Sequence, residues 1–143
     1  MKNAFSLLEI IIVVVIISIL TTFIISKSQD SIDMATKTKI KSEITLIKNS
    51  IAKQKTKKVL LDNEELSSLD DANINQLNSK LFNRILDFPL ISTNNSIKEI
   101  GKWVKISSSD YLIYLDREIN LVFSFENSFF TCKSELVLCE DYE

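Results

Sequence analysis

The most constraining feature of the sequence is an apolar run from Phe5 to Ile25. About twenty apolar residues are enough for one helical membrane span, at a rise of about 1.5 Å per residue. One charged residue, Glu9, interrupts the run. A carboxylate in a membrane span costs about 2.5–3.5 kcal/mol near the bilayer centre and less near the surface. We therefore predict a transmembrane helix over residues 5–25 in which Glu9 has a function beyond anchoring.

The residues on either side of the run predict its orientation. Residues 1–4 form a short leader that carries one lysine, Lys2. A cleaved secretory signal would have a small-residue cleavage site after its apolar core, whereas Ile24–Lys27 offers none. An ordinary secretory signal therefore fits poorly. By the positive-inside tendency, Lys2 predicts a cytoplasmic N-terminus and places the rest of the chain outside.

A short basic leader, a small residue, the motif F-S-L-L-E and a long apolar helix together resemble the prepilin signature of type IV pilins and type II secretion pseudopilins. In that family a prepilin peptidase removes the leader and methylates the new N-terminus. The resemblance implies cleavage between Ala4 and Phe5, methylation of Phe5, and a role for Glu9 in subunit assembly. It covers residues 1–25, and Ala4 stands where the family usually has glycine. The alternative is a plain signal anchor in which Glu9 is incidental.

The composition excludes several kinds of catalytic site. The chain has no histidine, so His-based acid–base chemistry, serine triads and imidazole-bound zinc are excluded. A single glycine, Gly101, leaves no glycine-rich phosphate loop. A run of acids lacks a recognisable calcium-loop spacing and is expected to be a solvated surface loop: Asp62, Glu64, Glu65, Asp70 and Asp71. We predict no enzyme activity, no cofactor and no metal site.

Helical spacing continues beyond the apolar run, through residues 26–58. Isoleucines recur at intervals of four, three and four and form one apolar stripe: Ile40, Ile44, Ile47 and Ile51. A helix unbroken from Phe5 to about Lys57 would be about 80 Å long. We expect the stripe to pack on the protein's own sheet rather than in an independent coiled coil, because it lasts too few heptads.

The pattern of residues 59–143 predicts a small head that contains both helix and strands. Leu60–Asp71 is expected to be a loop, and Asp70 or Asp71 can cap a short amphipathic helix that Pro89 ends. The apolar face of that helix is Ile74, Leu77, Leu81 and Ile85, broadened by Phe82 and Leu86.

Beyond Gly101 the pattern changes to period two. Four short strands separated by polar turns are predicted, at Trp103–Ile106, Tyr111–Leu115, Ile119–Phe125 and Phe129–Lys133. Such short connections favour an antiparallel meander. The predicted fold class is therefore α+β. A long N-terminal helix, with a transmembrane half and an amphipathic half, packs on a small antiparallel sheet, as in the lollipop fold that the pilin resemblance implies.

Charge is distributed unevenly along the chain. Residues 26–58 contain nine lysines and three acids, whereas residues 59–143 contain fifteen acids and seven basic residues. A basic stalk and an acidic head could pair laterally between subunits. Four lysines could contact DNA phosphates, although a solvated helix end is the favoured interpretation: Lys53, Lys55, Lys57 and Lys58.

Cys132 and Cys139 are the only cysteines, and both follow the predicted span. In an oxidising compartment two such thiols normally pair, so a disulfide is favoured over free or metal-bound thiols. Pilin heads are often closed near the C-terminus by such a bond, so the resemblance implies the same pairing.

The resemblance implies a structural subunit of a pilus-like fibre that serves type II protein secretion or DNA uptake. The D-P-W-G-type signature of major secretion pseudopilins is absent, which favours a minor subunit. The expected partners are other pilin subunits, the prepilin peptidase, the inner-membrane assembly platform and membrane lipid. The head would be periplasmic on a single-pass inner-membrane anchor. The alternative is an anchored periplasmic binding domain that never polymerises.

Overall fold

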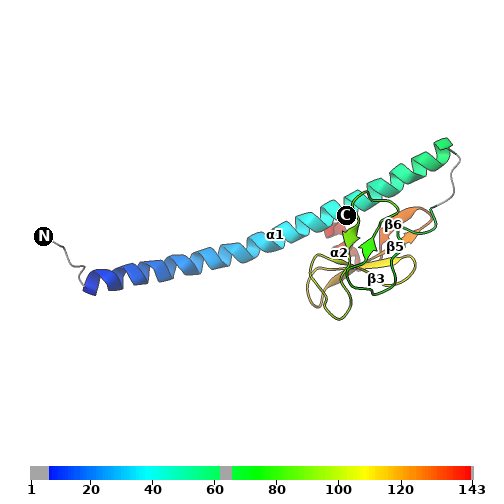
Figure 1. Cartoon of the computed structure of the whole chain (residues 1–143). Helices are drawn as coiled ribbons and strands as arrows, with labels where there is room; N and C mark the ends of the chain where they lie inside the picture. Colours follow the sequence, from blue (N-terminus) through cyan, green and yellow to red (C-terminus); the bar gives the residue numbers. More distant parts are fainter. Residues whose placement is uncertain (1–6, 62–65, 143) are drawn as a thin grey trace. The chain divides into compact units, whose positions relative to one another are not determined.

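The computed structural model describes residues 7–61 and 66–142, except for the side chains of residues 22–33, 58 and 61 (Figure 1). The chain divides into two compact units, Met1–Thr36 and Lys37–Glu143. Helix α1 (Leu7–Leu61) contributes residues to both units. The second unit adds a small antiparallel sheet and a short C-terminal helix, so the fold class is α+β.

The four-stranded sheet of the second unit is a meander. Its strands are β3 (Trp103–Lys105), β4 (Asp110–Tyr114), β5 (Asn120–Glu126) and β6 (Phe129–Cys132), paired antiparallel in the order β3-β4-β5-β6. The predicted strands and their antiparallel order are confirmed. The β5–β6 connection is a tight turn in which Asn127 and Ser128 both have positive φ, 51° and 63°. Two such residues are typical of the hairpin turn whose twist matches that of the strands.

The isoleucine stripe of α1 packs on the sheet within the second unit. Its four residues, Ile40, Ile44, Ile47 and Ile51, are at most 3% exposed. They join one core with the inward residues of β5, Leu121, Phe123 and Phe125. The expectation that the stripe would pack on the chain's own sheet is therefore confirmed.

Aromatic rings fill the centre of this core. Phe82 lies edge-on to Trp103, with ring centroids 5.6 Å apart, and Phe123 stacks on Phe130 at 5.0 Å. Tyr111 lies against Phe82 at 4.7 Å. Such contacts stabilise a core beyond the area that they bury.

The prediction of an amphipathic helix over residues 74–86 is wrong. That segment consists of turns and one short strand, β1 (Lys80–Leu81), which pairs antiparallel with β2 (Leu90–Ile91). Asn75, Asn78 and Phe82 have φ of 55°, 56° and 60°, which an α-helix cannot contain.

The backbone of this segment bonds to distant residues in place of its own helical neighbours. The N–H of Asn75 donates to Lys105 O at 2.8 Å, and the N–H of Asn78 donates to Ser92 O at 3.1 Å. Asparagine tolerates the left-handed conformation because its short polar side chain bonds locally. Tertiary hydrogen bonds therefore override the helical spacing.

Helix α2 (Leu136–Tyr142) was not predicted from the sequence. Its Cys139 forms a disulfide with Cys132 at the end of β6, with the two Cα atoms 5.8 Å apart. The predicted pairing is confirmed, and the bond attaches α2 to the sheet.

Candidate functional site

The described N-terminal part of α1 is apolar on all sides. We call residues Leu7–Thr21 the apolar segment. Every described side chain in it is exposed, and the exposed fraction of its leucine, isoleucine and valine side chains runs from 48% for Val13 to 76% for Leu7. A helix that is hydrophobic all round is normally covered by other helices or by lipid. Nothing else in the first unit covers these side chains among the described residues.

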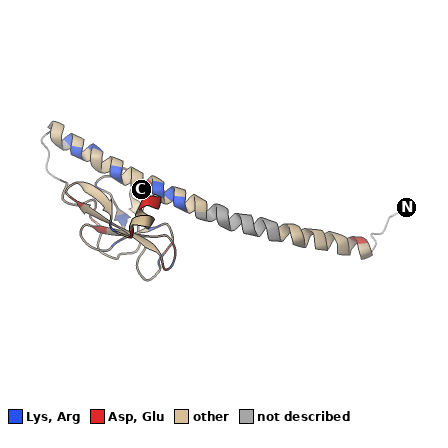
Figure 2. Ribbon diagram, turned by 180° about the vertical axis from the view of Figure 1, so that it is seen from behind, with Lys and Arg blue, Asp and Glu red and all other residues tan. Residues whose placement is uncertain are grey.

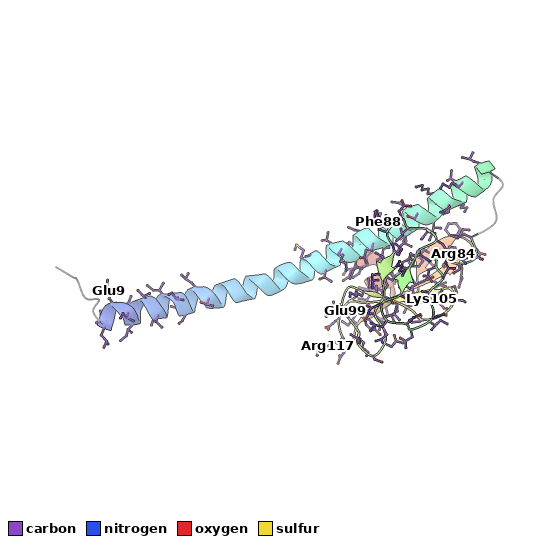
Figure 3. The ribbon with its side chains drawn as sticks, in the orientation of Figure 1. Glu9, Arg84, Phe88, Glu99, Lys105 and Arg117 are labelled. Atoms are coloured by element: carbon purple, nitrogen blue, oxygen red, sulfur yellow. A yellow bond between two sulfur atoms is a disulfide. The ribbon has the colours of Figure 1, made fainter. Side chains whose placement is uncertain are left out.

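Glu9 lies in the first turn of α1 and is the only charged residue of the apolar segment (Figure 3). No described residue forms a hydrogen bond or ion pair with its carboxylate. The hydroxyl groups of the segment are satisfied internally. Ser18 Oγ donates to Val14 O at 2.7 Å, and Thr21 Oγ1 donates to Ile17 O at 2.6 Å. Glu9 is therefore the group of this segment that needs a partner.

The predicted cleavage residues, Ala4 and Phe5, lie outside the described residues. The predicted span over residues 5–25 lies partly outside them, since the side chains of residues 22–33 are also not described. The described residues contain no helix with an apolar stretch of the length that a bilayer crossing requires.

The part of α1 in the second unit is rich in lysine (Figure 2). The head itself engages several of these lysines, among them Lys37 and Lys39. Lys37 Nζ lies 3.3 Å from Asp141 Oδ2, and Lys39 Nζ donates to Gly101 O at 3.0 Å. Asp141 thus neutralises the charge of Lys37, and the carbonyl group of Gly101 binds the ammonium group of Lys39. The helix therefore offers fewer unengaged lysines to a partner than the sequence suggests.

The lysines considered for DNA contact lie near the C-terminal end of α1. Lys53, Lys55 and Lys57 are exposed, and the side chain of Lys58 is outside the described residues. Lys55 Nζ lies 4.6 Å from the centre of the Phe129 ring, which is a cation–π contact. Lys53 and Lys57 line a hollow that Phe88 also lines and that Lys55 does not. The three lysines with described side chains therefore do not form one uniform phosphate-binding row.

Glu43 joins α1 to the sheet. Its Oε2 accepts a hydrogen bond from Trp103 Nε1 at 2.9 Å, and its Oε1 lies 3.7 Å from Lys39 Nζ. Burial raises the pKa of Glu43, although the bond from Trp103 and the charge of Lys39 act in the opposite direction. Both oxygens of the Glu43 carboxylate contact groups of this chain, so we interpret this residue as structural.

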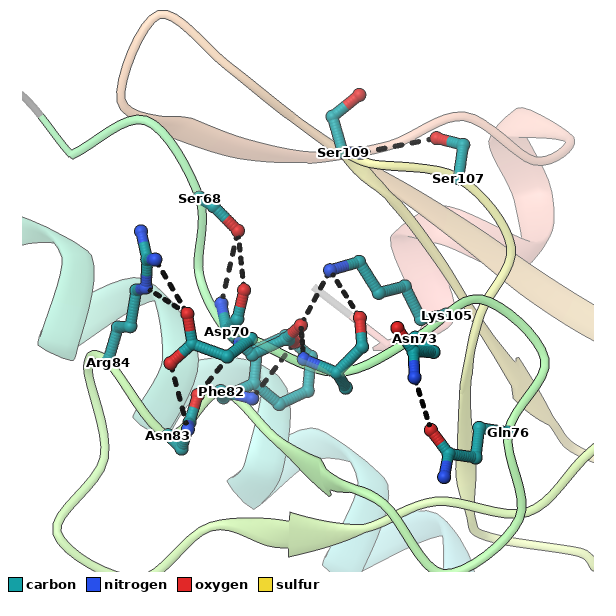
Figure 4. Close-up of polar contacts among 12 residues, drawn as sticks. Ser68, Asp70, Asn73, Gln76, Phe82, Asn83, Arg84, Lys105, Ser107 and Ser109 are labelled. Carbon is teal, nitrogen blue, oxygen red and sulfur yellow. Dashed lines mark hydrogen bonds and ion pairs between the residues drawn. The ribbon is translucent and has the colours of Figure 1, made fainter.

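A buried ion pair lies where the segment after α1 meets β3 (Figure 4). Asp70 Oδ1 is 2.7 Å from Lys105 Nζ, and their side chains are 0% and 8% exposed. The carboxylate also accepts hydrogen bonds from the N–H groups of Ala72 and Phe82, both at 3.1 Å. Lys105 Nζ donates a further bond to Ala72 O at 3.0 Å. The expectation that Asp70 lies in a solvated loop is wrong, whereas Asp71 is exposed and pairs with Arg84.

Tyr111 completes this buried cluster. Its hydroxyl oxygen is buried and has no hydrogen-bond partner among the described residues. Burial, and then the neighbouring Asp70 charge, raise the pKa of Tyr111 far above its usual range. Because the cluster is sealed from solvent, we interpret it as structural. The sequence gives no signal for it, since a lysine at the end of a short strand is normally expected to be solvated.

The described part of the chain contains neither a metal-binding cluster nor a free thiol. No group of three or more acidic or cysteine side chains is arranged to hold a metal ion there. Both cysteines form the disulfide, so the free-thiol and metal-bound alternatives are wrong.

Comparison with known proteins finds no family model, no curated protein and no solved structure that matches the chain. A functional assignment therefore depends on the residues of this chain.

Proposed function

We propose that the protein is a minor subunit of a pilus-like fibre, stored in the inner membrane and used in type II protein secretion or DNA uptake. Glu9 carries the proposal. It is the one carboxylate in an apolar helical segment, it follows F-S-L-L, and no described residue of its own chain pairs with it. A segment that only anchored a domain would be more stable without this charge.

The exposed side chains of the apolar segment support an intermolecular role. Exposed apolar patches of this size mark surfaces that meet lipid or another protein. We propose that lipid covers the segment in the stored protein and that neighbouring helices cover it in the fibre. The leader, residues 1–4, would be removed by the prepilin peptidase, and the chain would be handed to the inner-membrane assembly platform.

Glu9 has a physical role in this proposal. Cleavage before Phe5 creates a positive α-amino group, and Glu9 of one subunit can neutralise that group on a neighbour. The cost of both charges in an apolar environment then falls only when subunits meet in one register. Correct pairing therefore favours ordered addition of subunits.

The proposed architecture follows from the same assignment. The first part of α1 would be the transmembrane half, with its N-terminus cytoplasmic. The second part, whose isoleucine stripe packs on the sheet, would be the amphipathic half of the helix and would lie in the periplasm with the head, residues 59–143. The disulfide fits an oxidising compartment, because such bonds are rare in the cytosol. The lollipop fold of the pilin family has this arrangement.

The experiment is the substitution Glu9→Leu in the native cells. The variant is expected to insert in the membrane normally, because it removes a charge from an apolar helix, and to fail to enter the fibre. Cross-linking to neighbouring subunits measures assembly, and resistance to carbonate extraction measures anchoring. Thr21→Leu is the matched control, since it makes the same segment more apolar without touching the charge. Normal cross-linking of Glu9→Leu would overturn the proposal.

An anchored periplasmic domain that never polymerises is the competing function. That protein would tolerate Glu9→Leu without loss, and its chain would keep Met1 because no peptidase would process it.

A further inference from the structure

The two edges of the four-stranded sheet have different surroundings. The outer edge of β3 is already paired with the irregular segment that precedes it. Lys105 O accepts a hydrogen bond from the N–H of Asn75 at 2.8 Å, and Trp103 O accepts one from the N–H of Thr93 at 2.9 Å. These bonds close the β3 edge.

The outer edge of β6 is open. The N–H of Lys133 donates to Val122 O at 2.7 Å, which fixes the alternation of the β5–β6 ladder. In an antiparallel ladder the backbone groups of successive residues point to opposite sides. Thr131 therefore faces β5, and the backbone groups of Phe130 and Cys132 face away from it. No described backbone group is bonded to that side of either residue.

A groove of about 500 Å³ lies beside this open edge, between β6 and α1 of the same unit. Its floor is mostly apolar, and two lysines of α1 lie at its rim. The residues that line the groove include Ile51, Ala52, Phe129, Phe130, Lys48 and Lys55. Phe129 is 59% exposed although it lies in a strand, and Lys55 extends over its ring.

We propose that the β6 edge and this groove bind an extended acidic segment of another polypeptide, which adds to the sheet as a fifth strand. In this mode the main chain of the added strand bonds to the edge, and alternate side chains enter neighbouring pockets. An apolar side chain would enter the groove over Ala52, and an acidic neighbour would face Lys55. The proposal goes beyond fibre membership and concerns only the second unit.

Charge selects this occupant over a second copy of the chain. Symmetric pairing of two β6 edges would bring two sets of rim lysines to one interface. Like charges brought together at an interface are destabilising. A different, acidic segment removes that repulsion and complements the lysines.

The test uses the full chain in detergent micelles and a fluorescent synthetic peptide in which valine and glutamate alternate. The comparison peptide has lysine in place of glutamate. The acidic peptide is expected to bind at least about tenfold more tightly at low salt. It should also slow hydrogen exchange at the amides of Phe130 and Cys132. Equal binding of the two peptides, or unchanged exchange at both amides, would overturn the proposal.

Matched variants separate the groove from general attraction to a basic helix. Lys55→Glu should weaken binding of the acidic peptide by about tenfold or more, whereas Lys53→Glu makes the same charge change outside the groove and should weaken it less. Ala52→Phe should block the groove, and Asn49→Phe is its control on the same helix. Equal losses for Lys55→Glu and Lys53→Glu would show attraction without a site and would contradict the inference.

Discussion

Helix α1 carries one glutamate in each of the two compact units, and the surroundings of these two glutamates differ. In the apolar segment Val14 is 56% exposed and Glu9 has no partner among the described residues. In the second unit Ile47 is fully buried and Glu43 accepts a hydrogen bond from Trp103. One part finds its partners within the chain, whereas the apolar side chains of the apolar segment are exposed in the described part of the chain.

The difference originates in the arrangement of apolar residues along the helix. A stripe at intervals of three and four buries one face and leaves the rest solvated, so a single sheet is enough to cover it. A helix apolar on all sides cannot be covered by one small sheet. The same helical geometry therefore produces a folded contact in one part and, in our proposal, a surface for assembly in the other.

The largest effect on folding is expected where a charge depends on a partner inside the head. Asp70→Ala removes the carboxylate that pairs with buried Lys105, and breaking such a pair costs about 3–5 kcal/mol. Glu9→Leu should leave the free energy of unfolding of the head unchanged, because Glu9 belongs to the other compact unit. Urea unfolding of both variants in micelles, followed by Trp103 fluorescence, measures the difference.

The matched control for this loss is Asp70→Leu combined with Lys105→Met. Replacing both charges by apolar residues should recover part of the stability, since no buried charge is left unpaired, although the N–H groups of Ala72 and Phe82 lose their acceptor. A head that unfolds as easily with Glu9→Leu as with Asp70→Ala would contradict the separation of the two parts.

A slightly smaller effect is expected from the stripe itself. Ile47→Ala removes a fully buried side chain, which costs about 2–5 kcal/mol in a core. Leu46→Ala, at a neighbouring position that is 48% exposed, should cost much less. Val14→Ala should not change head unfolding. Similar losses for Ile47→Ala and Leu46→Ala would mean that the stripe is not the face that holds the sheet.

The smallest effect is expected in the pH dependence of stability. Burial raises the pKa of Glu43 in the folded state above its ordinary value of 4.5, so the folded state binds a proton more tightly than the unfolded state. This group therefore lowers stability as the pH rises from about 4.5 through the raised pKa. Glu43→Gln keeps an acceptor for Trp103 and should remove that slope. Identical pH profiles of the two proteins would contradict the assignment.

The parts that sequence reasoning predicted depend on local periodicity. Four strands alternate apolar and polar residues between short polar turns, and β3 to β6 form there. The isoleucine stripe likewise identifies its own buried face. The disulfide followed from the expected compartment, since two cysteines beyond a membrane span normally pair.

The parts that were missed depend on contacts between distant residues. Leu81, Phe82 and Leu86 are buried as a helix face would be, but Ile74 and Leu77 are exposed. The N–H of Phe82 bonds to Asp70, so the chain turns there and no helix continues. Neither the burial of Asp70 nor its pairing with Lys105 can be predicted from residue spacing, because the two residues are 35 positions apart.

The first measurement is mass spectrometry of the N-terminus of protein purified from its own membrane. A mature chain that begins at methylated Phe5 is the predicted result, and it would identify the protein as a processed fibre subunit despite Ala4. A chain that still begins at Met1, in cells that contain the peptidase, would contradict that identity. It would favour the anchored periplasmic domain.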